Sequence, residues 1–151
     1  MNIRDAGDTL FLIMITNGEK KKQFLGLIFL HLSGILCIIS EFVFWTNDLS
    51  IFNLFQLEEI TNNIIYLIPL VGGSGILLSA LNIAIFKKKS YKLWYILLVI
   101  LLNLLFYFLL EVFSNEGAYL WRYMGIYTLI SALLCLLFGI LFQISARAEN
   151  S

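Results

Sequence analysis

Residues 91–113, YKLWYILLVILLNLLFYFLLEVF, decide the fold, because this apolar stretch has one basic side chain at its start and one acidic side chain near its end. A helix needs about 20 mostly apolar residues to cross a hydrocarbon core of roughly 30 Å. Residues 24–45, 63–86 and 119–144 meet the same requirement. The sequence therefore predicts an all-α integral membrane protein, with four transmembrane helices in an antiparallel bundle.

The composition leaves little room for a soluble part. Residues of the AVILMFWYC set make up 60% of the 151 residues, and the mean hydropathy is +0.90. Soluble domains contain roughly 45–50% apolar residues even when glycine is counted. The leader, 1–22, and the loop, 46–62, are each too short to bury a core of their own. We therefore expect a single four-helix transmembrane domain over 1–151, with the lipid bilayer as its surroundings.

In a four-span topology, the basic residues are distributed very unequally between the two sides of the membrane. Of the ten basic residues, Arg122 alone falls near the outer side. Positive residues close to span ends stay in the cytoplasm, so we expect both termini inside and the cell (plasma) membrane as the location. The basic residues on the inner side are Arg4, Lys20, Lys21, Lys22, Lys87, Lys88, Lys89, Lys92 and Arg147.

Two segments outside the spans are apolar. Residues 9–16 are too few to cross a bilayer, and they suggest a short interfacial helix that starts at Asp8 and ends at Asn17-Gly18. The loop 46–62 has an apolar pattern that suits a short helix on the outer surface. That helix would be either a lid or docking surface for a partner, or simply a loop that dips into the interface.

Small and polar residues recur at helical spacing along the spans, and such residues bring helices together in lipid. We therefore expect these stripes to face the bundle interior. Cys37 and Cys135 lie at different depths, which predicts two free thiols. The stripes are Gly26, Ser33, Gly34, Cys37, Ser40 and Glu41; Pro69, Gly72, Gly75, Ser79 and Asn82; Asn103, Tyr107 and Glu111; and Arg122, Gly125, Thr128, Ala132, Cys135, Gly139 and Gln143.

Pro69 is followed by the cluster Gly72, Gly73 and Gly75. Proline removes a backbone hydrogen bond and glycine loosens a helix, so this segment predicts a kink. A kink inside a bundle can expose carbonyl groups to an ion or substrate. The alternative is that the glycines permit close contact between helix backbones.

Glu41, Glu111 and Arg122 form a candidate ion-pair cluster, because each lies about 3–6 Å inside the outer end of its span. A charge buried alone is costly, whereas a hydrogen-bonded acid–base pair can persist. We expect Arg122 to pair with one or both acids. The cluster would either fix the packing register or leave one carboxylate for a proton or cation.

His31, the only histidine, is expected to lie in a polar core with Asn82, Asn103 and Gln143. A hydrogen bond from His31 to Asn82 or Gln143 is the simplest role. A proton relay is the alternative, but it needs a chain of titratable groups, and Asn103 cannot titrate.

No catalytic residue, cofactor site or metal site is predicted. One histidine excludes bis-histidine haem ligation and a His-Glu-x-x-His metal site. The lysine triplets are topology signals and give no support for nucleic-acid binding. We expect a non-enzymatic accessory or structural subunit that assembles with other membrane proteins or with itself. The alternative is a small proton- or cation-coupled transporter or channel that uses the outer cluster.

Overall fold

The computed structural model describes residues 3–46, 49–50, 67–85, 91–116 and 124–148. Among the described residues, each of the four helices contains a stretch that is long and apolar enough to cross a membrane, which confirms the four long apolar helices expected from hydropathy. The helices are α1 (Ile3–Phe42), α3 (Ile68–Ile85), α4 (Tyr91–Glu116) and α5 (Met124–Ala148). The corresponding membrane-length stretches are Gly18–Phe42, Ile68–Ile85, Lys92–Val112 and Met124–Ala146.

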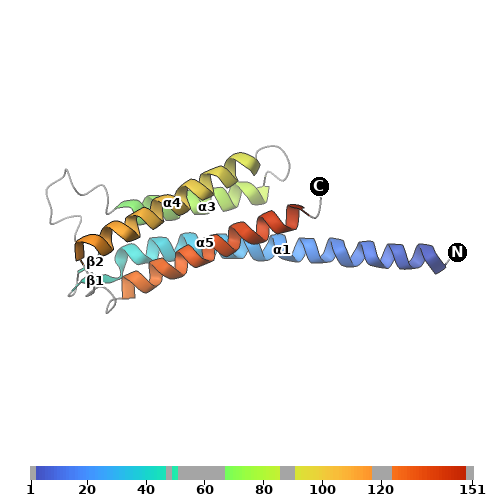
Figure 1. Ribbon diagram of the computed structural model, residues 1–151, viewed down its shortest axis with the longest axis horizontal. Coiled ribbons are helices and arrows are strands. Elements are labelled where there is room, and N and C mark those ends of the chain that lie inside the picture. Colours follow the sequence, from blue (N-terminus) through green and yellow to red (C-terminus); the bar gives the residue numbers. More distant parts are fainter. Residues whose placement is uncertain (1–2, 47–48, 51–66, 86–90, 117–123, 149–151) are drawn as a thin grey trace.

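Consecutive helices run in opposite directions, so the bundle is antiparallel (Figure 1). α1 packs most extensively against α5 and next against α3, while α3 also packs against α4. α4 and α5 make the fewest contacts of these neighbouring pairs. The helices therefore follow the order α5, α1, α3, α4 around the bundle, and the packing between neighbours is weakest between α4 and α5.

α1 is one continuous helix of 40 residues, and its N-terminal part projects beyond the other helices (Figure 1). At about 1.5 Å per residue it is roughly 60 Å long, about twice what a bilayer core requires. The prediction that a short helix ends at Asn17-Gly18 is wrong. A single glycine inside a helix costs only about 1 kcal/mol, and the helix formers Glu19 and Lys20 follow it directly.

A short antiparallel pair of strands follows α1. β1 (Phe44–Thr46) pairs with β2 (Leu49–Ser50), and Phe44 lies opposite Ser50. The loop expected to form a surface helix thus begins as a hairpin. Residues 51–62 of that loop lie outside the described part of the chain, so the helix there stays a prediction.

Glycines bring α1 close to both of its neighbours. A Cβ atom added to Gly73 of α3 would lie 2.7 Å from the carbonyl oxygen of Gly34 and 2.9 Å from the Cβ atom of Cys37. A Cβ atom added to Gly139 of α5 would lie 2.8 Å from a methyl carbon of Leu30. Such close contacts are how helices associate in lipid, and they account for the stripes of α1, α3 and α5 facing inward.

The stripe of α4 faces the other way. Asn103 and Tyr107 are exposed, the latter by 56%, whereas Leu98, Leu105 and Phe108 are fully buried. The expectation that Asn103 belongs to the polar core is therefore wrong. The reason lies in α3, because the leucines of α4 fill the hollows over its glycines: the Cδ2 atom of Leu105 lies 3.0 Å from the Cβ position of Gly72.

Candidate functional site

Glu41 is the most unusual buried residue of the bundle. It lies next to the C-terminal end of α1, on the same face as Cys37 and Ser33, and is 0% exposed. Neither of its carboxylate oxygens has a hydrogen-bond partner among the described residues. Burial of an unpaired carboxylate costs several kcal/mol. This position therefore needs a compensating proton, cation or basic side chain.

The structure tests the expected cluster around Glu41 only in part. Glu111 is half-buried near the C-terminal end of α4, and its side chain or backbone takes part in an interaction. Arg122 lies outside the described residues. Pairing of Arg122 with either acid therefore stays a prediction.

Gln143 ties three helices together at the opposite end of the bundle. Its Nε2 atom donates to the backbone oxygen of Gln23 in α1 at 2.7 Å, and the hydroxyl of Tyr95 in α4 donates to its Oε1 atom at 3.3 Å. Gln143 is only 1% exposed, in keeping with its expected place in the core. Tyr95 could not be predicted as a partner of Gln143, because a tyrosine close to a span end resembles an interfacial anchor.

His31 and Asn82 do not join this polar contact. Nδ1 of His31 is 2.8 Å from the backbone oxygen of Leu27, and Nδ2 of Asn82 donates to the backbone oxygen of Leu78 at 2.8 Å. Each of these hydrogen bonds therefore stays within the side chain's own helix. His31 is hydrogen-bonded as expected, but the partners expected for it, Asn82 and Gln143, are wrong.

A third cross-helix hydrogen bond lies near the middle of the membrane-length stretch of α1. Oγ of Ser33 donates to the backbone oxygen of Ala132 in α5 at 2.8 Å, and Ser33 is fully buried. Together with the contact at Gln143, this bond links the two most extensively packed helices of the bundle at two depths.

Pro69 lies in the first turn of α3 rather than in the interior of a longer helix. In the first turn the missing N–H would have no intrahelical partner anyway, so this proline does not interrupt the described helix. Gly72, Gly73 and Gly75 each face an atom of α1 or α4 within 3.0 Å of an added Cβ. The arrangement favours close packing over a ligand-lining kink at Pro69–Gly75.

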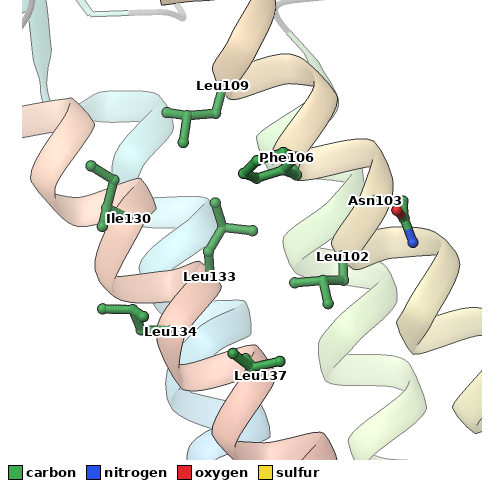
Figure 2. Close-up of a pocket in the computed structure, with 8 residues that line it drawn as sticks. All are labelled: Leu102, Asn103, Phe106, Leu109, Ile130, Leu133, Leu134 and Leu137. Carbon is green, nitrogen blue, oxygen red and sulfur yellow. The ribbon is translucent and has the colours of Figure 1, made fainter.

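A groove of about 370 Å³ separates α4 from α5 (Figure 2). Its lining is almost wholly apolar, and Asn103 is the one polar residue among those that line it. Phe106 and Leu102 reach from α4 towards α5, whereas the amide of Asn103 points away from α5 (Figure 2). The volume is within the range of small-molecule pockets, roughly 300–1,000 Å³. The lining lacks the convergent polar groups that would orient a substrate. Sequence periodicity could not find this groove, because leucine-rich faces look alike whether they pack together or stand apart.

No group of three or more histidine, cysteine or acidic residues comes together as a possible metal site within the described residues. Both cysteines are free, as predicted. The helices and their hydropathy indicate a multi-pass helical membrane protein. Comparison with protein-family models, with curated proteins and with solved structures finds no match.

Proposed function

We propose that this chain is a non-enzymatic, four-span membrane protein that works as a structural or accessory subunit, assembled with copies of itself or with other membrane proteins. The observation that carries the proposal is the exposed side-chain amide of Asn103 within a span. Lipid tails cannot hydrogen-bond to an amide, whereas a neighbouring helix can. The weakly packed α4 adds support, since only 28% of its span is buried within the chain, against 33–44% for the other three.

The asymmetry of basic residues supports a definite orientation. Nine of the ten lie on the side of the two termini and the 87–92 turn in the four-span topology, and positive residues close to spans stay in the cytoplasm. The proposed location is the cell membrane, with both termini inside.

Mild extraction from the native membrane tests the assembly. The full-length tagged chain is extracted in a gentle detergent, and the protein mass of the particle is determined by native mass spectrometry. We expect a mass well above the 17.3 kDa of one chain, with defined stoichiometry. A particle that contains one copy and no other protein would contradict the proposal.

A second function is favoured by Glu41. A fully buried carboxyl group without a hydrogen-bond partner among the described residues suits a proton- or cation-coupled transporter or channel. Liposomes containing the purified chain would then show proton or cation flux that Glu41→Gln abolishes. Glu19→Gln, a matched change at a buried acid in the same helix, would preserve the flux. Equal flux for the wild type and Glu41→Gln would remove Glu41 from any transport role.

A further inference from the structure

The exposed face of α4 carries an amide at the middle of the membrane. Asn103 lies roughly 16 Å along the helix from Lys92, which is near the centre of a hydrocarbon core of about 30 Å. It is the one side-chain amide that is exposed among the residues whose burial the structure describes, since Gln23 and Asn82 are half-buried and Gln143 is buried.

Its own helix satisfies only part of this amide. Nδ2 donates one hydrogen bond to the backbone oxygen of Val99 at 2.8 Å. An asparagine amide offers two N–H donors and an acceptor oxygen, so one donor and the Oδ1 atom remain without a partner among the described residues. A serine on the neighbouring α3 differs, because Ser74 places its one donor on the backbone oxygen of Leu70.

Exposed residues continue along α4 on both sides of Asn103. They recur at alternating steps of three and four, which is the heptad spacing of a helix–helix seam. The other spans expose stripes of similar spacing, because exposure itself follows the helical period, so the amide and not the spacing distinguishes α4. The seam residues are Leu93, Ile96, Ile100, Asn103, Tyr107 and Leu110, and the five besides Asn103 are 53–63% exposed.

We infer that two copies of this chain pair through α4, with Asn103 of each copy hydrogen-bonded to Asn103 of the other. Copies inserted in one membrane share their orientation, so a twofold axis lies along the membrane normal and the two α4 helices run parallel. Each residue on the seam then lies opposite the same residue of the other copy, at the same depth in the membrane. An amide is both donor and acceptor, so it is complementary to itself, and one polar residue in an apolar seam fixes register and the number of chains. This inference names the partner in the assembly proposed above and rests on that proposal.

Energy transfer between labelled copies tests the pairing. Full-length chains with donor or acceptor dyes are reconstituted in liposomes over a range of protein-to-lipid ratios. We expect Asn103→Leu to raise the dimer dissociation constant about 3- to 20-fold, which corresponds to one interhelical hydrogen bond in a membrane. Asn103→Gln keeps the amide and should dimerise nearly as the wild type does. Asn82→Leu, which removes a half-buried amide with the same type of backbone bond, should leave dimerisation unchanged.

Cysteine cross-linking tests the face. In a Cys37→Ala, Cys135→Ala background, Ile100→Cys and Tyr107→Cys should form disulfide-linked dimers on oxidation in the bilayer. Phe106→Cys is similarly exposed, by 53%, but lines the groove towards α5 and should not cross-link. Circular dichroism checks that each variant keeps its helices.

Three results would overturn the inference: monomers at every protein-to-lipid ratio, cross-linking through Phe106 but not the seam, or an unchanged dissociation constant in Asn103→Leu. The assembly proposal would survive these results if the extracted particle contained a stoichiometric second membrane protein. The assembly proposal would be contradicted, together with the inference, only if the extracted particle contained a single chain and no other protein.

Discussion

Serine hydroxyl groups in this bundle donate hydrogen bonds either to another helix or to their own helix. Ser33 donates to the backbone oxygen of Ala132 in α5, whereas Ser74 donates to Leu70 in its own helix. We expect Ser33→Ala to lower the free energy of unfolding by about 0.6–1.7 kcal/mol, because an interhelical bond in the membrane is lost. Ser74→Ala is the control and should change it by less than about 0.5 kcal/mol. Reversible unfolding in mixed micelles measures both, and equal effects would contradict the assignment.

The buried carboxyl group of Glu41 makes a second prediction at this scale. Arg122 is the basic residue expected to compensate it, so mutations at the two positions should not be additive. In a double-mutant cycle with Glu41→Gln and Arg122→Gln, we expect a coupling energy of about 0.5–3 kcal/mol in unfolding measurements. The pair Glu41→Gln and Lys21→Gln is the control and should be additive. Additivity in the first cycle as well would mean that Glu41 is compensated by a proton or a cation instead.

Helix packing depends on glycines at particular positions. Gly73→Ala would place a Cβ atom 2.7 Å from a backbone oxygen of α1, which can move only if the helices separate. Overpacking of this kind costs about 1–3 kcal/mol, so we expect a lower thermal midpoint in detergent. Gly18→Ala meets nothing within 4 Å and should raise helix stability by up to about 1 kcal/mol. A neutral Gly73→Ala would show that α1 and α3 are not in close contact.

The orientation of individual helices could be predicted only where small residues lie on one face. Gly26, Ser33 and Cys37 are buried as expected, because small residues on one face of α1 allow the neighbouring helices to approach closely. For α4 the same reasoning failed, because the polar residues Asn103 and Tyr107 are not small and leucines pack over the glycines of α3 instead. The sequence also did not predict that α1 continues through Gly18. The tendency of Asn17-Gly18 to end a helix is outweighed by the helix propensity of the residues that follow it.

At the scale of the whole molecule, the four membrane-length apolar helices of the described residues follow from hydropathy, because a chain in lipid must satisfy its backbone hydrogen bonds within each helix. The order of helices around the bundle and the groove between α4 and α5 do not follow, because hydropathy does not distinguish a leucine that contacts lipid from one that contacts a helix. Of the candidate site, the burial of Glu41 and Gln143 could be predicted from their position on small-residue stripes. Their partners could not, because these depend on the relative rotation of the helices.

The topology of the chain is the central claim, and single-cysteine labelling tests it most directly. In a Cys37→Ala, Cys135→Ala background, Ser50→Cys and Lys88→Cys are each treated on intact cells with a maleimide that cannot cross the membrane. With four crossings and both termini inside, Ser50→Cys labels at once and Lys88→Cys labels only after the membrane is permeabilised. Labelling of Lys88→Cys on intact cells, or protection of Ser50→Cys until permeabilisation, would contradict this topology.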